Sequence, residues 1–430
     1  MKRNRKRITL ALAICILASL TAGCGVSPSA PAPSPGSQPE SAFSKSPSAG
    51  TDGKSSSSPS VSKSEDVSDL SLEQKVGQMF FLCFRKETSG ANILTCTPSV
   101  RETLRTVQPG GIILFGENIS SVEQVRGLIR GMQEECSTPP FLGVDQEGGT
   151  VQRITRTAQI PAMVIPPMQS VARAGSISLA RSVGQVIAGE LTVFGLNLDF
   201  APDCDVLTNP KNTSIGTRSF SSDAATAAAY STAVADGIRG EGIIPVCKHF
   251  PGLGGASADT HDGFSEVGQT LAQLRETEFV PFQAQINAGA EMIMVGHISL
   301  PKVTGNSTPA SLSPKVITGL LRGELGFGGI VITDSLSMGA VTKSYSSGQA
   351  AVLAVQAGAD MLLMPEDPGA AFQAVLSAVR SGKISEARID ASVERILALK
   401  KSHGLFTPKA PGDVSLLGCA DHRAVIGQVG

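Results

Sequence analysis

A basic residue, two imidazoles and a carboxylate lie close together in the stretch from Lys248 to His261. Lys248 and His249 follow a short apolar run, residues 243–247, which predicts a strand that delivers polar groups to its carboxyl end. Asp259 lies two residues before His261 on a Gly-rich loop. A carboxylate beside an imidazole fixes the tautomer of the ring and raises its pKa, so the ring could serve as an acid and then as a base. The alternative is a surface Asp-x-His in an ordinary loop.

A further carboxylate, Asp334, follows the apolar run 328–333, so a strand would hold it rigidly. Carboxylates and imidazoles around a pocket, with Lys and Arg to hold hydroxyl groups, suit glycosyl transfer, which in retaining enzymes needs a nucleophilic carboxylate and an acid/base group. Alternatively, Asp334 caps the next helix. Zinc is the other chemistry considered, but His249, His261 and Asp259 match no common zinc spacing. The sequence therefore predicts no metal.

These groups need a scaffold, and the chain offers eight short apolar runs separated by helical patterns. The runs show little polar alternation, as expected for strands buried on both faces. Alternating strands and helices predict an α/β fold with a parallel sheet, and eight repeats predict a closed TIM (β/α)₈ barrel rather than an open doubly wound sheet. The predicted strands are 78–84, 111–115, 141–144, 196–200, 243–247, 292–295, 329–332 and 360–364. The predicted helices begin near Ser71 and continue at 124–135 (after a capping-box pattern at 120–123), 177–194, 224–239, 271–288, 314–322, 348–357, 370–380 and 385–403.

Ionisable side chains follow seven of these runs. The carboxyl ends of the strands build the active site of a TIM barrel, so a concentration of such residues there favours an enzyme. The starts of the runs carry fewer ionisable residues. The residues at the run ends are Glu117, Asp145, Glu147, Asp203, Asp205, Lys248, His249, His297, Asp334 and Glu366.

Composition excludes several classes of protein. A formal net charge of -1 over 430 residues argues against a nucleic-acid partner, which would favour a basic face. The eight cysteines have no paired spacing, so they indicate neither a zinc site nor a disulfide framework. No dinucleotide or nucleoside-triphosphate fingerprint follows any run, and we expect no cofactor.

The N-terminus predicts export. Residues 2–7 are basic, and residues 8–20 form an apolar segment that is short for a membrane span. Residues 1–23 resemble a bacterial lipoprotein signal, in which Cys24 becomes the lipid-bearing terminus at the outer face of the cell membrane. An ordinary secretory signal and a retained anchor are the alternatives. Residues 24–66 are rich in Ser and Pro, which predicts a disordered tether.

Five motifs stand in order along the chain. They are Gly143-Val144-Asp145-Gln146-Glu147-Gly148-Gly149-x-Val151-x-Arg153, Asn197-Leu198-Asp199-Phe200-Ala201-Pro202, Ile215-Gly216-Thr217-Arg218-Ser219-Phe220, Lys248-His249-Phe250-Pro251-Gly252 and Thr333-Asp334-Ser335-Leu336-Ser337-Met338. Together these motifs resemble glycoside hydrolase family 3, in particular its bacterial β-N-acetylhexosaminidase branch. The resemblance spans residues 67–405 and implies a TIM barrel and a retaining mechanism through a covalent glycosyl-enzyme.

The resemblance also implies roles for individual residues. Asp334 matches the nucleophile, His261 the acid/base of that branch, and Asp259 the partner of this histidine. The implied substrate is a β-linked N-acetylglucosamine (GlcNAc) end of a peptidoglycan fragment or a chitooligosaccharide. The positions that match those gripping the terminal sugar are Asp145, Arg153, Arg218, Lys248 and His249.

Two features depart from the family. The branch often reads Pro-Gly-His-Gly-Asp-Thr, whereas residues 251–256 read Pro-Gly-Leu-Gly-Gly-Ala, which bears on the leaving-group side of the pocket. Many members carry a second α/β domain, but only residues 404–430 follow the last predicted helix. We therefore expect the single-domain subtype, with residues 406–430 as a surface-packed tail.

Three other functions stay open. A histidine acid/base does not repel an incoming phosphate, so a GlcNAc phosphorylase is compatible with the same residues, and a β-glucosidase shares the family. A lipid-tethered sugar-binding protein is an alternative of another class. It would also suit the export signal, but it needs two hinged lobes rather than eight repeats.

Overall fold

Eight parallel strands form the centre of the structure, which is a computed structural model. It describes residues 65–156, 159–256, 265–407 and 409–430. Neighbours in the sheet are neighbours in sequence, in the order β7-β6-β5-β4-β3-β2-β1-β8. The strands are β1 (Phe80–Cys83), β2 (Gly111–Leu114), β3 (Phe141–Val144), β4 (Leu198–Asp199), β5 (Ile244–Phe250), β6 (Met292–Val295), β7 (Ile330–Thr333) and β8 (Leu362–Leu363).

The sheet closes between β7 and the residues directly before β8. The backbone nitrogens of Asp360 and Met361 lie 2.7 and 3.0 Å from the oxygen of Val331, to which they donate. The nitrogen of Thr333 donates in turn to the oxygen of Met361 over 3.0 Å. The eight strands thus form the TIM barrel that the sequence predicts.

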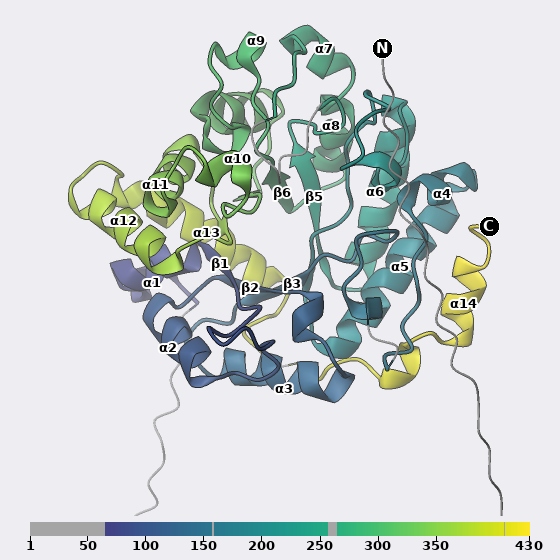
Figure 1. Cartoon of the computed structure of the whole chain (residues 1–430), viewed down its shortest axis with the longest axis horizontal. Helices are drawn as coiled ribbons and strands as arrows, with labels where there is room; N and C mark the ends of the chain where they lie inside the picture. Colours follow the sequence, from purple (N-terminus) through teal and green to yellow (C-terminus); the bar gives the residue numbers. More distant parts are fainter. Residues whose placement is uncertain (1–64, 157–158, 257–264, 408) are drawn as a thin grey trace, which may run out of the picture. The chain divides into compact units, whose positions relative to one another are not determined.

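Helices surround the strands, as Figure 1 shows. Helix α5 has the bounds that the sequence predicts. The helices are α1 (Leu72–Gln78), α2 (Pro98–Val107), α3 (Val122–Gln133), α4 (Met168–Arg173), α5 (Ile177–Phe194), α6 (Ala224–Gly240), α7 (Leu271–Glu276), α8 (Phe279–Asn287), α9 (Pro301–Thr304), the π-helix η6 (Lys315–Glu324), α10 (Gly339–Thr342), α11 (Ser347–Ala357), α12 (Pro368–Arg380), α13 (Glu386–Ser402) and α14 (Ala420–Ile426). Short 3₁₀ turns are η1 (Val67–Asp69), η2 (Gly116–Asn118), η3 (Ile154–Arg156), η4 (Gly216–Arg218), η5 (Ala310–Leu312) and η7 (Val414–Leu416).

Side chains fill the barrel interior. In β1, Phe81 belongs to the cluster of buried side chains inside the barrel. Phe80 and Leu82 pack outward against the helices, as the period of two in a strand requires. Helix α13 closes the amino end of the barrel by adding Ile396 and Leu399 to the interior cluster. The open end is therefore the carboxyl end, where predicted site residues gather.

Two predicted helices differ in the structure. The predicted helix 271–288 is broken into α7 and α8, because Pro281 has no N–H and cannot continue a helix from the preceding turn. The predicted capping box at 120–123 is shifted by one position. Ser121 is the N-cap of α3 and its side chain accepts from the Gln124 nitrogen.

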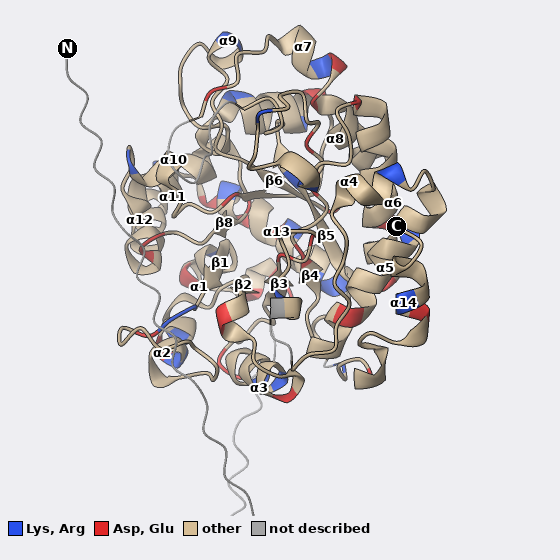
Figure 2. Cartoon of the chain, turned by 45° about the vertical axis from the view of Figure 1, so that its right-hand side comes forward, with Lys and Arg blue, Asp and Glu red and all other residues tan. Residues whose placement is uncertain are grey.

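Acidic and basic segments are interspersed over the helices in Figure 2, in keeping with the near-zero net charge. No helix within the described residues is long and apolar enough to cross a membrane. The predicted signal, residues 1–23, and nearly all of the predicted tether, including Cys24, lie outside the described residues.

Candidate active site

A cavity of about 380 Å³ opens at the carboxyl ends of the strands. Its polar wall comes from residues that follow β3 and β7, from the end of β5, and from η4 and the turn before it. It brings together six side chains that the sequence singled out, although they are far apart along the chain. These six are Asp145, Arg153, Arg218, Lys248, His249 and Asp334.

Asp334 directly follows β7 and lines this cavity. Its backbone nitrogen donates to the oxygen of Val295 over 2.8 Å, and its Oδ1 accepts from the Ser335 nitrogen over 2.7 Å. Burial alone would raise the pKa of Asp334, but the nearby His297 and His249 and the Ser335 N–H outweigh it and hold this pKa below its usual value. Asp334 is therefore a fixed, ionised carboxylate. It does not cap the next helix, because the N-cap of α10 is Met338.

Strand β5 is longer than predicted and carries two of the site residues. The predicted run ends at residue 247, whereas β5 continues to Phe250, so Lys248 and His249 lie within the strand. Successive side chains of a regular strand point to opposite faces, yet both of these line the cavity. The pairing of β5 with β6 shifts register between Cys247 and Phe250, and this irregularity allows both side chains to face the cavity.

Lys248 links two carboxylates that follow β3. Its Nζ lies 2.9 Å from Asp145 Oδ1 and 2.6 Å from Glu147 Oε1, and only 3% of its side chain is exposed. Burial would lower the pKa of Lys248, but the two carboxylates raise it above its usual value. Asp145 also accepts from Arg153 Nη2 over 3.2 Å. Lys248 and Arg153 together overcome the effect of burial and lower the pKa of Asp145, so all three groups are charged.

Arg218 holds the other side of Glu147. Its Nε and Nη2 lie 2.7 and 2.8 Å from the two oxygens of Glu147, which is a bidentate pair. Burial opposes ionisation of Glu147, yet Arg218 and Lys248 hold its pKa well below the usual range. The guanidinium therefore has a single fixed orientation at the cavity wall.

His249 forms a dyad with a buried carboxylate. Its Nδ1 lies 2.7 Å from Asp205 Oδ2, and its Nε2 lies 3.5 Å from Arg218 Nη2. Burial lowers the pKa of His249, but Asp205 more than compensates and raises it. Asp205 also accepts from the Leu253 nitrogen. The carboxylate thus fixes the tautomer and orientation of the ring.

Three buried groups, Asp203, Asp205 and His249, have donor atoms within 4.8 Å of one another, which is the spacing of a metal site. Positive charge is already supplied there, because Arg218 Nη2 lies 3.4 Å from Asp203 Oδ2 and His249 contacts Asp205. Burial and the neighbouring Asp205 raise the pKa of Asp203 to about 8. A protonated acid beside a guanidinium is a poor ligand for a cation.

Some residues of the site were not assigned a role from the sequence. Glu147, Asp205 and His297 were noted only as ionisable residues at run ends, although Glu147 lies within the first motif. The position at a run end was the available signal. This signal does not show which residue each side chain pairs with, because Glu147 pairs with Arg218, 71 positions away in the sequence.

The predicted acid/base pair is not among the groups placed in the cavity. Asp259 and His261 lie outside the described residues. Their roles stay predictions.

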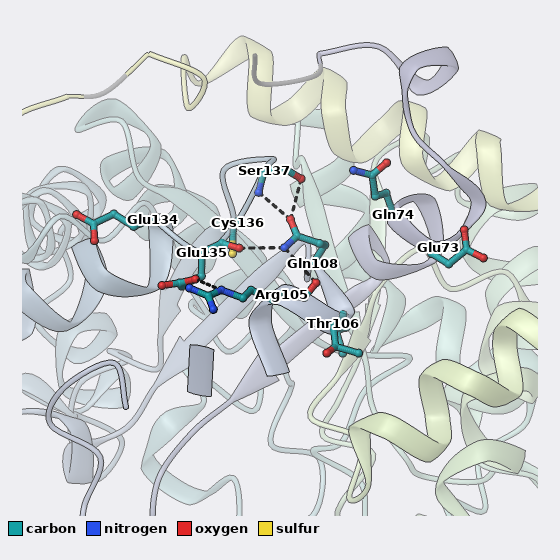
Figure 3. A pocket seen from close by; sticks show the side chains of 10 residues that line it. Glu73, Gln74, Arg105, Thr106, Gln108, Glu134, Glu135, Cys136 and Ser137 are labelled. Atoms are coloured by element: carbon teal, nitrogen blue, oxygen red, sulfur yellow. Dashed lines mark hydrogen bonds and ion pairs between the residues drawn. The ribbon is translucent and has the colours of Figure 1, made fainter. Parts of the chain in front are cut away.

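A second hollow, of about 420 Å³, lies at the amino end of the barrel, between the ends of helices α2 and α3 and the start of α1 (Figure 3). Several of its polar groups are paired with one another. Gln108 accepts from the Ser137 nitrogen over 2.7 Å and donates to the Glu135 oxygen over 2.9 Å, and Arg105 pairs with the Glu135 carboxylate. Residues that follow the carboxyl ends of the strands line the first cavity and not this hollow, so the cavity at the carboxyl end is the candidate site.

The chain also matches known proteins. Residues 71–399 match the family model described as the glycosyl hydrolase family 3 N terminal domain. The chain is 36% identical over 290 residues to the "Beta-hexosaminidase" of Stenotrophomonas maltophilia (strain R551-3), covering 65% of this chain and 83% of that protein. It is 30% identical over 394 residues to "Beta-hexosaminidase A" of Pseudoalteromonas piscicida, covering 82% of this chain. The chain spans 65% of the length of that second relative.

A solved structure shows the same fold. The glycoside hydrolase family 3 β-N-acetylglucosaminidase from Paenibacillus sp. str. FPU-7 superposes with a TM-score of 0.78 at 36% sequence identity. The match covers 84% of this chain and 68% of that chain.

Proposed function

This chain belongs to glycosyl hydrolase family 3, and we propose that it is a retaining β-N-acetylhexosaminidase that removes terminal GlcNAc. The observation that carries the proposal is the state of Asp334. It is an ionised carboxylate, fixed by backbone hydrogen bonds directly after β7, at the wall of a cavity of about 380 Å³. A retaining glycosidase needs such a carboxylate to attack the anomeric carbon and form the glycosyl-enzyme.

The remaining wall suits the hydroxyl groups of one sugar. Asp145 accepts hydrogen bonds, and Lys248 and Arg153 donate them from positions on either side of its carboxylate. Arg218 and His249 supply further donors, each oriented by a buried carboxylate. These mutual ion pairs fix the side chains before the sugar arrives, which reduces the entropic cost of binding.

The acid/base role belongs, in this proposal, to His261 with Asp259 as its partner. The ring protonates the departing oxygen in the first step and takes a proton from water in the second. The same groups admit phosphate in place of water, so the second step distinguishes a hydrolase from a phosphorylase. We assign hydrolysis as the main reaction, on β-linked GlcNAc ends of peptidoglycan fragments or chitooligosaccharides.

The test is turnover of p-nitrophenyl β-GlcNAc by the wild type and by Asp334→Asn, with p-nitrophenyl β-glucoside as the competing substrate. We expect release of nitrophenol from the GlcNAc substrate and a loss of at least about 10³-fold in kcat for the variant. A wild type that prefers the glucoside, or a variant that keeps wild-type activity, rejects the proposal. In phosphate buffer the product should be GlcNAc, and GlcNAc-1-phosphate as the main product would make the protein a phosphorylase.

We also propose that the enzyme works outside the membrane, tethered by a lipid on Cys24. The support is the signal pattern in residues 1–23 and the Ser/Pro-rich segment that follows it. Radiolabelled palmitate should enter the wild type and not Cys24→Ser in a bacterial host. Equal labelling of the two would reject the lipid anchor and leave the enzymatic proposal unaffected.

A further inference from the structure

Glu190, in helix α5, joins two distant segments of the chain through a buried carboxylate. Only 1% of the residue is exposed. Its Oε2 accepts from the backbone nitrogen of Met163 over 2.8 Å. Its Oε1 accepts from the nitrogen of Gly418 over 2.8 Å and lies 3.2 Å from His422 Nδ1. One carboxylate thus binds the segment between β3 and α4 and also the C-terminal tail.

The tail packs directly on these elements. Helix α14 lies beside α5, as Figure 1 shows. Gly418 has a φ of +54°, and a Cβ at this position would lie 2.3 Å from the backbone oxygen of Pro161. Only glycine allows so close an approach. The tail that the sequence predicts to be surface packing therefore contacts the segment that Glu190 holds.

That segment leads to the cavity through a second set of hydrogen bonds. The nitrogen of Ile165 donates to Gln152 Oε1 over 2.8 Å. The Gln152 amide donates to the oxygens of Gly149 and Ile165 over 2.8 and 3.1 Å. The residue after Gln152 is Arg153, whose guanidinium reaches Asp145 in the cavity wall. The backbone that carries Arg153 is thus fixed by the same segment that Glu190 ties to the tail.

We propose that Glu190 is a positioning residue for the sugar pocket, through which the C-terminal tail fixes the segment 161–165 and hence Arg153. The inference rests on the proposed role of Arg153 in holding the terminal sugar. It assigns the tail a part in substrate affinity rather than in surface packing alone.

The chemistry requires a carboxylate at this position. A carboxylate only accepts hydrogen bonds, and all three of its neighbours are N–H groups or a ring that can donate. A glutamine has one accepting oxygen, and its NH₂ would face a donor. In Glu190→Gln either Met163 or Gly418 therefore loses its partner while buried, and the segment loosens.

The experiment compares Glu190→Gln with Glu135→Gln. Glu135 is also a carboxylate held by N–H donors, with a side chain that is 6% exposed and paired with Arg101 and Arg105, but it lies at the amino end of the barrel. Both variants should melt at a lower temperature than the wild type. Only Glu190→Gln should raise the KM for p-nitrophenyl β-GlcNAc, by about tenfold, with a smaller change in kcat, because substrate binding must then re-order a segment that has lost one buried hydrogen bond.

Hydrogen exchange supplies a readout that does not need turnover. Amides of residues 161–165 should exchange faster in Glu190→Gln and at the wild-type rate in Glu135→Gln. Faster exchange in a protein that does not cleave the GlcNAc substrate would reject the proposed function and retain the structural link. An unchanged KM with unchanged exchange would overturn the positioning role. Should Glu190→Gln fail to fold, His422→Ala decides, because it removes one tail contact, and an unchanged KM in that variant also overturns the role.

Discussion

The Nε2 of His297 lies 2.8 Å from the backbone oxygen of Ser335, the residue directly after Asp334. A carbonyl oxygen only accepts, so Nε2 carries a hydrogen and donates it. The other ring nitrogen, Nδ1, lies 2.7 Å from the Ser311 hydroxyl. The ring therefore fixes the backbone that follows Asp334, and it is the first of the groups that oppose the effect of burial on the pKa of this carboxylate.

His297→Ala should slow catalysis without abolishing binding. The carboxylate loses both its orientation and part of the electrostatic support for its charge, so we expect kcat to fall on the order of 10- to 100-fold. The pKa of Asp334 should rise, which moves the acid limb of the kcat/KM profile to higher pH. His297→Gln restores an N–H donor toward Ser335 and should recover part of kcat. A profile whose acid limb does not move in His297→Ala would contradict this role.

Lys248→Met should lower both stability and activity. The substitution leaves the partly buried Asp145 and the buried Glu147 with one donor fewer each, and breaking a buried ion pair costs about 3 kcal/mol. Urea unfolding measures the loss. Adding Asp145→Asn removes one of the two carboxylates that have lost Lys248, so the double variant should regain part of the stability while remaining inactive. Additive losses in the double-mutant cycle would contradict a direct coupling between the two residues.

The barrel could be predicted from the sequence because its strands are buried on both faces. The eight runs are mostly apolar, with few polar interruptions such as Asn197 and Asp199, so their identity as strands depends little on context, and all eight are present. Short sequence patterns failed where contacts with the rest of the chain decide the secondary structure. Helix α2, which begins after Thr97 at Pro98, was not predicted, although proline at the first helical position favours a start there. A helix was predicted at 314–322, but no local pattern marks it as the π-helix η6.

The candidate site could be predicted only in part. Asp334 was found because it follows a strand and matches a motif. The presence of both Lys248 and His249 in the cavity depends on a register shift between two strands, which no local pattern specifies. The same holds for long-range partners: Glu190 meets His422 across 232 positions. Contacts of this kind are set by the closure of the barrel and not by neighbouring residues.

Glu278 should make stability depend on pH. Burial raises the pKa of this fully buried carboxyl from 4.5 to about 7, and the nearby Asp205 adds to the effect. The folded state binds the proton more tightly than the unfolded chain. The contribution of Glu278 to the free energy of unfolding is therefore largest below pH 4.5 and is lost as pH rises to about 7. At about 1.4 kcal/mol per pKa unit, this loss is at most roughly 3 to 4 kcal/mol.

Urea unfolding between pH 4.5 and 8 measures the effect. Glu278→Gln should flatten the decline in stability over this window but not remove it, because Asp199 and Asp203 have pKa values raised to about 8 by burial. Glu276→Gln, at an exposed carboxylate two positions earlier, should keep the wild-type slope. Parallel curves of unfolding free energy against pH for Glu278→Gln and the wild type would show that Glu278 ionises equally in the folded and the unfolded state.

Gly255 stands where the related branch often has aspartate, and it lies against Glu278. A Cβ at this position would be 3.4 Å from Glu278 Oε1 and 3.0 Å from Gln269 Oε1. Gly255→Asp and Gly255→Asn meet the same crowding, so the difference between them isolates the charge. At pH 8 Glu278 is ionised, and the aspartate variant should be less stable than the asparagine variant by about 1 kcal/mol through like-charge repulsion. At pH 5.5 Glu278 is protonated and can donate a hydrogen bond to the new carboxylate, so the difference should vanish or reverse. A difference that is the same at both pH values would mean that position 255 does not sense the Glu278 charge, and that the glycine is explained by space alone.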